Sequence, residues 1–181
     1  RKRSNLTIYP RLTSAESIKH VLTQYQKSLT AEFGDIIDKE ADSVRVVKEL
    51  AGEEDPGDLR KIAEDLPIVR IVDTLVKHAI LQSASDIHIE PYEHEVIVRY
   101  RIDGILHDTM TLPKPVHAGI IARIKVLSNL RLDEHRLPQD GRFKIETDDY
   151  KVSFRVSVLP VFDGEKVVMR LLPEDSKGYT L

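Results

Sequence analysis

The chain has 181 residues, of which 41% are hydrophobic, and this is enough for one folded domain and a smaller piece. Cysteine is absent, which excludes a disulfide scaffold, a cysteine-ligated zinc site and thiol catalysis. The net charge is −3, tryptophan is absent, and no apolar run reaches the roughly 18 residues of a membrane span. We therefore expect neither a nucleic-acid partner nor a membrane-crossing helix.

The distribution of charge divides the chain into units. Residues 1–33 carry six basic and two acidic side chains, residues 34–66 carry five and eleven, and residues 67–172 are balanced. Because the first unit is too small to bury a core, we predict that it is the end of an upstream domain. It would contain a short strand and a helix with a capping box at Thr13. Residues 34–66 are predicted to be a weakly packed acidic connector with a short helix.

Residues 67–172 show one helix followed by three strands, and then this order again. The first helix begins at Pro67 and carries the clearest apolar stripe of the chain, up to Ile80. The second helix is predicted at 116–127. The predicted strands are 86–90, 96–102, 105–112, 142–147, 150–159 and 166–172. This order predicts an α+β domain with an antiparallel sheet and two helices.

The hairpin signals predict which side chains lie opposite one another. If Asp148-Asp149 is a two-residue turn, Phe143 faces Phe154 and Ile145 faces Val152, which gives an apolar face for the core. On the polar face of the same hairpin, Arg142 then lies opposite Arg155. If Asp163-Gly164 is likewise a turn, Arg170 lies opposite Ser157 and diagonal to Arg155.

Two arginines opposed across a strand pair destabilise each other by up to about 1 kcal/mol. Such a pair is favourable when an anion lies above it, and arginine binds phosphate oxygens in a bidentate way. Arg142, Arg155 and Arg170 are therefore candidates for an anion site. The alternative is a structural role, in which these arginines pair with carboxylates elsewhere, such as Asp140 or Glu165.

The hairpin at Asp103-Gly104 predicts a different situation for two further arginines. Arg99 lies opposite Asp108, an ordinary cross-strand ion pair with a structural role. Arg101 lies opposite Leu106 and has no such local partner, so it is a weaker phosphate candidate.

One cluster of histidines and acids resembles a metal site only superficially. His88 and Glu90 share a strand face, near Glu93 and His94, but no further ligand has suitable spacing. We therefore predict no metal site. Asp86 is predicted to fix the turn before this strand.

The loop 131–141 is rich in acid–base groups, but no nucleophile has an adjacent base. Its titratable side chains include Asp133, Glu134, His135 and Asp140. The sequence also contains no G-x-x-x-x-G-K-[ST] motif, so it has no phosphate-cradling loop of that kind. We predict that this chain is not an enzyme by itself.

Five sequence blocks resemble the secretion and pilus-extension ATPases called GspE and PilB. The blocks are SASDIHIEPYE from Ser83, VRYRIDGILH from Val98, RLPQDGR from Arg136, FRVSVLP from Phe154 and GEKVVMRLL from Gly164. The resemblance implies that 67–172 form the PAS-like domain that precedes a RecA-like ATPase domain. It also implies that 173–181 link the two domains, and that the Walker A and B motifs would follow Leu181.

The resemblance implies a role for the arginines. In the family, arginines of the PAS-like domain reach the phosphates of ATP held by the RecA-like domain, and Arg142 and Arg155 match those positions. Arg170 and Arg101 also match motif positions. The fragment itself would hold no cofactor, whereas the parent protein would bind ATP and Mg.

The resemblance also implies the cellular setting. The parent would be a cytoplasmic homohexamer, peripheral at the inner membrane, whose partners are its own ATPase domain, neighbouring subunits and a membrane-platform protein. We expect the chain to be its phosphate-sensing regulatory and assembly domain. One alternative is an adaptor that docks the platform protein and uses the arginines structurally. Another is a free-standing sensor of a small nucleotide.

Overall fold

The computed structural model describes residues 12, 14, 17–18, 56–147 and 151–173. The strand and capped helix predicted in 1–33, most of the predicted connector and the predicted linker after Pro173 lie outside these residues. The helices are α3 (Pro56–Glu64), α4 (Leu66–Leu81) and α5 (His117–Leu127), the last preceded by a single 3-10 turn, η1 (Lys114–Val116). The strands are β1 (Asp86–Pro91), β2 (Glu95–Ile102), β3 (Ile105–Pro113), β4 (Gln139–Glu146), β5 (Lys151–Val161) and β6 (Gly164–Pro173).

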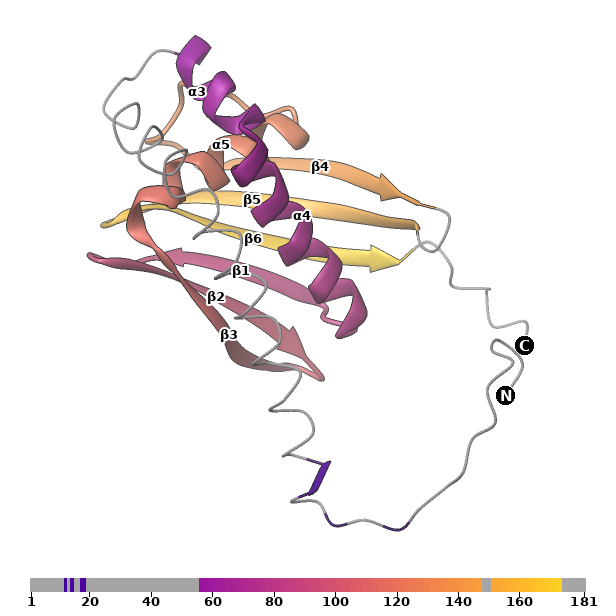
Figure 1. Ribbon diagram of the computed structural model, residues 1–181. Coiled ribbons are helices and arrows are strands. Elements are labelled where there is room, and N and C mark those ends of the chain that lie inside the picture. Colours follow the sequence, from indigo (N-terminus) through magenta and orange to yellow (C-terminus); the bar gives the residue numbers. More distant parts are fainter. Residues whose placement is uncertain (1–11, 13, 15–16, 19–55, 148–150, 174–181) are drawn as a thin grey trace.

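The six strands form one antiparallel sheet in the order β3-β2-β1-β6-β5-β4 (Figure 1). Each half of the sheet is a meander of three consecutive strands, and the halves join where β1 pairs with β6. The predicted order of helix, three strands, helix and three strands is confirmed, as is the α+β PAS-like class. None of the described helices is both long and apolar enough to cross a bilayer.

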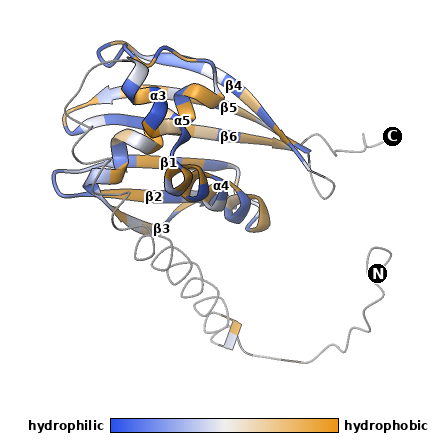
Figure 2. Ribbon diagram, turned by 45° about the horizontal axis from the view of Figure 1, so that its top comes forward, coloured by the Kyte–Doolittle hydropathy of each residue, from blue (hydrophilic) through white to orange (hydrophobic). Residues whose placement is uncertain are grey.

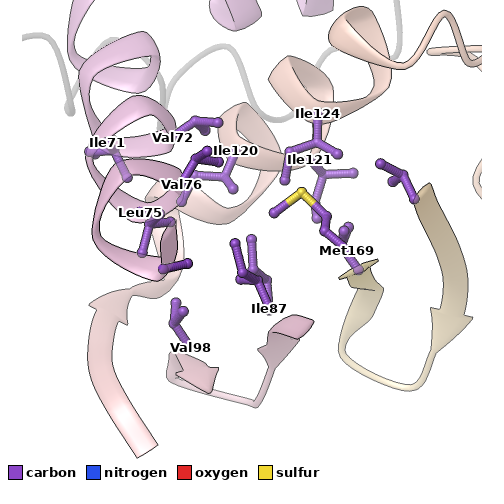
Figure 3. Close-up of a cluster of buried hydrophobic side chains, with 14 of the residues drawn as sticks. Ile71, Val72, Leu75, Val76, Ile87, Val98, Ile120, Ile121, Ile124 and Met169 are labelled. Carbon is purple, nitrogen blue, oxygen red and sulfur yellow. The ribbon is translucent and has the colours of Figure 1, made fainter. Parts of the chain in front are cut away.

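The core lies between one face of the sheet and the helices α4 and α5 (Figure 3). In α4 the stripe predicted from Pro67 onward is buried as far as Ala79, and Ile80 is partly buried, because its apolar residues recur at the helical period. Figure 3 shows Leu75 and Val76 of α4 and Ile120 of α5 gathered above Ile87 of β1. Tyr100 is also buried, and its hydroxyl donates a hydrogen bond of 2.8 Å to the Leu75 carbonyl.

The two hairpins with local turns have the predicted registers. At Asp103 and Gly104 both φ angles are positive, 50° and 82°, which suits a two-residue turn that matches the twist of the strands. Between β4 and β5, Phe143 pairs with Phe154, and their rings stack with centroids 4.6 Å apart. Arg142 pairs with Arg155, as predicted.

The predicted register between β5 and β6 is wrong by two residues. The turn is Phe162-Asp163 and not Asp163-Gly164, because Gly164 already pairs with Val161 in the sheet. A Cβ at Gly164 would lie 2.9 Å from Cε1 of the buried His117, and its φ is 131°. This glycine therefore permits close packing on α5 and an unusual backbone conformation, and it is not the centre of the turn.

The predicted weak packing of 34–66 does not hold for its final part. Residues 56–64 form α3, and Leu59, Ile62 and Ala63 are buried, with Ile62 belonging to the core cluster. The acidic composition of this segment did not indicate a packed helix. Its three apolar residues lie on one face of the helix and its charges on the other. The described domain thus has three helices where two were predicted.

Candidate anion-binding site

The two faces of the sheet differ in chemistry. Residues that point towards α4 and α5 are apolar and buried, whereas the alternate residues on the other face are mostly polar or charged. Figure 2 shows the hydrophobic stretches of α4 and α5 and the mixture of hydrophilic and hydrophobic residues along the strands. We call the polar side the open face, because no described helix packs on it in Figure 1.

A line of charged side chains crosses five strands of the open face. Direct pairing places the residues in the order Arg142, Arg155, Arg170, Asp86 and Arg101, on β4, β5, β6, β1 and β2. We call the four arginines of this line the arginine row. Since neighbouring strands are about 4.8 Å apart, the backbones of Arg142, Arg155 and Arg170 lie within about 10 Å of one another.

The position of Arg170 corrects the prediction. It lies directly opposite Arg155, not diagonal to it, because the β5–β6 turn is displaced by one residue. Arg155 is therefore flanked by an arginine on each side. Neither Arg142 nor Arg155 has an ion-pair partner among the residues that the structure describes. The predicted alternative partners have other contacts: Asp140 accepts a hydrogen bond from Ser157, and Glu165 is buried on the helical side.

Asp86 is the carboxylate of this line. Its Oδ1 accepts a hydrogen bond from Arg170 Nε at 2.9 Å, and its Oδ2 lies 3.2 Å from Arg101 Nε. Burial raises the pKa of Asp86, but hydrogen bonds from Arg170 and Ser85 and the charges of both arginines outweigh burial, so the pKa lies below its usual value. Asp86 is therefore ionised at neutral pH. The partner that Arg101 lacked in the sequence analysis comes from the adjacent strand.

A hollow of about 180 Å³ opens on the open face at the centre of this line. Its lining includes Arg155, Arg170, Asp86 and Ser157. Arg142 lies one strand beyond the hollow, and Arg101 lies on the far side of Asp86, where its Nη1 donates to the Gly104 carbonyl at 3.0 Å. Of the four predicted site residues, the structure thus brings Arg155 and Arg170 into one concavity and leaves Arg142 at its side.

A second group of charges on the open face is balanced. Glu90 forms ion pairs with Arg99 and with Lys166, the latter at 2.6 Å, and Arg99 also pairs with Asp108 at 3.4 Å. Burial raises the pKa of Glu90, but Lys166 and Arg99 lower it further than burial raises it. The cross-strand pair predicted between Arg99 and Asp108 is confirmed. We call these four side chains the Glu90 network.

His88 lies between the two groups and is half-buried. Burial lowers its pKa, and the charge of Lys166 lowers it further, so the ring is neutral at pH 7. Its Nδ1 is 3.7 Å from Glu90 Oε1, too far for a hydrogen bond. Among the described residues, no three His, Asp or Glu side chains gather in a way that would hold a metal ion.

The acid–base groups of loop 131–141 hold the loop in place ahead of Arg142. The buried Lys125 ammonium contacts Glu165 at 2.7 Å and donates to the Glu134 carbonyl at 2.7 Å. His135 Nδ1 is 2.7 Å from the other oxygen of Glu165. This buried cluster joins α5, the loop and β6, and it positions the strand that carries Arg142. Sequence reasoning missed it because Lys125 and Glu165 lie 40 residues apart.

The fold and the site define a PAS-like α+β domain. On the open face of its sheet it carries an arginine row with more positive charges than nearby carboxylates among the described residues. The family described as "Type II/IV secretion system protein" matches residues 61–180. The type IV pilus assembly ATPase PilB of Myxococcus xanthus is 40% identical over 91% of this chain and 29% of its own length.

Two type II secretion relatives match as well. Type II secretion system protein E of Xanthomonas campestris is 43% identical over 65% of this chain and 21% of its own length. The protein of the same name from Pectobacterium carotovorum is 35% identical over 92% of this chain and 33% of its own length. The chain therefore belongs to the type II/IV secretion system family of GspE and PilB. It spans only about a third or less of the length of these relatives.

Proposed function

We propose that this chain is the regulatory and assembly domain of a hexameric secretion or pilus-assembly ATPase. In this proposal Arg155, Arg170 and Arg142 contact the phosphates of ATP bound to a RecA-like domain of the parent protein, which would also coordinate Mg. The contact couples the nucleotide state to the relative position of the two domains. Neighbouring subunits and an inner-membrane platform protein would be the partners of the parent.

The observation that carries this proposal is the charge of the arginine row. The four guanidinium groups lie in line with one described carboxylate, Asp86, which contacts only Arg170 and Arg101. Arg155 faces an arginine on both adjacent strands. Like charges opposed in this way destabilise the fold, and a negatively charged ligand would offset this cost, which supports the proposal. Arginine forks match phosphate oxygens, and the row presents several of them side by side.

The same geometry suggests how the contact would act. Guanidinium groups near a transferred phosphoryl group stabilise the charge that builds up on its oxygens. Because these arginines lie on a rigid sheet, they can reach a nucleotide on another domain only when the domains close together. Hydrolysis would weaken the contact and permit opening. The weaker candidate, Arg101, would contribute charge from the far side of Asp86.

The test is the steady-state ATP turnover of the full-length parent with Arg155→Ala. We expect a loss of tenfold or more, which corresponds to about 1.4 kcal/mol of barrier. Lys151→Ala is the matched control: it removes one positive charge from the same strand and face, at an exposed pair with Glu146. Circular dichroism would establish that both variants are folded.

Unchanged turnover in a folded Arg155→Ala protein would contradict the proposal. The adaptor function would then be favoured, and its own measurement is a pull-down of the membrane-platform protein by the wild-type chain. If Lys151→Ala loses as much turnover as Arg155→Ala, the effect belongs to the general charge of the sheet and not to a contact with phosphate.

A further inference from the structure

We propose that Asp86 is an internal counter-ion that competes with the ligand phosphate for Arg170. In the absence of phosphate it holds Arg170, and it yields this arginine to an anion of higher charge. The inference rests on the proposed function, because it assumes that the arginine row contacts phosphate. It adds Asp86 as a residue that sets the affinity of the arginine row for phosphate.

The first argument is the place of the carboxylate. Asp86 lines the same hollow as Arg155 and Arg170, so an anion that enters this hollow approaches a negative charge. The Asp86 side chain is 5% exposed and that of Arg170 is 65% exposed, so the carboxylate is fixed while the arginine can turn towards a ligand.

The second argument is how the arginines are held. Arg170 and Arg101 both contact Asp86 through Nε, one on each carboxylate oxygen. For Arg170 this leaves the two terminal amino groups without a partner among the described residues, and these groups form the fork that binds phosphate. Arg101 is held a second time by the Gly104 carbonyl. Arg170 is therefore the member of the pair that can be released.

The third argument is the balance of charge. A carboxylate carries one negative charge, whereas a terminal phosphoryl group carries about two near neutral pH. Between Arg155 and Arg170 the phosphoryl group is therefore the electrostatically stronger partner. Asp86 lowers the positive potential of the empty row and thus weakens the binding of any anion that cannot displace it.

The experiment uses the whole 181-residue chain and inorganic tripolyphosphate as the probe. Binding is followed by NMR chemical shifts of the arginine Nε–H groups at about 0.1 M salt, in a buffer without phosphate or sulfate. We expect Asp86→Asn to bind tripolyphosphate about fivefold to tenfold more tightly than wild type. If this variant does not fold, Asp86→Ser tests the same expectation.

Two further variants separate the counter-ion role from other causes. Glu90→Gln removes the same charge on the same strand about 13 Å away, beyond the screening length at 0.1 M salt, and it should leave the affinity within twofold of wild type. In an Arg170→Ala background, Asp86→Asn should give less than half of its gain, because the arginine for which Asp86 competes is gone.

The possible outcomes distinguish the inference from the proposed function. Equal or weaker binding by a folded Asp86→Asn chain, together with loss of binding in Arg155→Ala, would overturn the counter-ion role and leave the phosphate contact standing. A full gain that persists without Arg170 would also overturn it. If neither wild type nor Asp86→Asn binds tripolyphosphate, both proposals fail.

Discussion

Around Glu90, two cations share a carboxylate whose side chain is 12% exposed, and a second carboxylate, Asp108, completes the balance. On the same face of the same sheet, four arginines lie in line with one carboxylate, Asp86, which contacts only Arg170 and Arg101. In both groups the charged residues alternate along the strands with residues that point into the core. The fold therefore does not account for the difference in charge balance between the two groups. The Glu90 network stabilises the sheet, whereas the arginine row stores an excess of positive charge at a cost in stability.

The largest effect on stability is expected when the Glu90 network is broken. Glu90→Gln leaves Arg99 and Lys166 without the carboxylate that they share in a half-buried site. We expect the free energy of unfolding in urea to fall by about 2–3 kcal/mol, less than the loss typical of a fully buried pair. Glu146→Gln is the control, since its pair with Lys151 is exposed and screened by water, so its loss should be much smaller. Equal losses in the two variants would refute the distinction.

A smaller effect is expected from acid at Asp86. Because its pKa is lower in the folded chain than in the unfolded one, the ionised carboxylate stabilises the fold fully above about pH 4 and loses this contribution as the pH falls through the folded pKa. Asp86→Asn should be less stable than wild type by about 1–2 kcal/mol at pH 6, and the gap should narrow below pH 4. Urea unfolding of both proteins at pH 6 and pH 3 measures this difference in the free energy of unfolding. A gap that stays constant with pH would show that the charge is not its source.

The smallest effect is expected in the arginine row, and it has the opposite sign. Arg155→Gln relieves two like-charge contacts, so the free energy of unfolding should stay constant or rise by up to about 1 kcal/mol in a buffer without sulfate or phosphate. Arg142→Gln, on the edge strand β4 with a single arginine opposite, should gain less. Added sulfate should stabilise wild type more than Arg155→Gln, because a ligand stabilises only the state that binds it. A clear loss of stability in Arg155→Gln would assign the residue a structural role.

The contrast also separates what the sequence could predict from what it could not. The pairing of Arg142 with Arg155 and of Arg99 with Asp108 follows from local turns and the two-residue period of strands, so both were predictable. The β5–β6 register was not predictable from the sequence. A side chain at position 164 would clash with His117, so a glycine is required there by packing and not by the turn. A packing requirement on a glycine has the same sequence signature as a turn requirement.

Asp86 was missed as part of the site for a different reason. Its pairing with Arg170 joins residues 84 positions apart, through the contact of β1 with β6. Nothing in the local sequence of either strand specifies its neighbour in the sheet. The four arginines could therefore be named as candidates from sequence motifs, but the carboxylate among them could be assigned only from the topology.

The sheet order has a consequence for how this site comes into being during folding. Each three-strand meander can form from contacts close in sequence, whereas the β1–β6 junction requires the two halves to meet across a long loop closure. The hollow takes Asp86 from one half and Arg155 and Arg170 from the other. A chain whose halves have not yet joined possesses neither the pairing of Asp86 with Arg170 nor the complete lining of the candidate anion site. The phosphate binding that we propose would therefore be acquired in the last step of folding, and it would stabilise the junction that closes last.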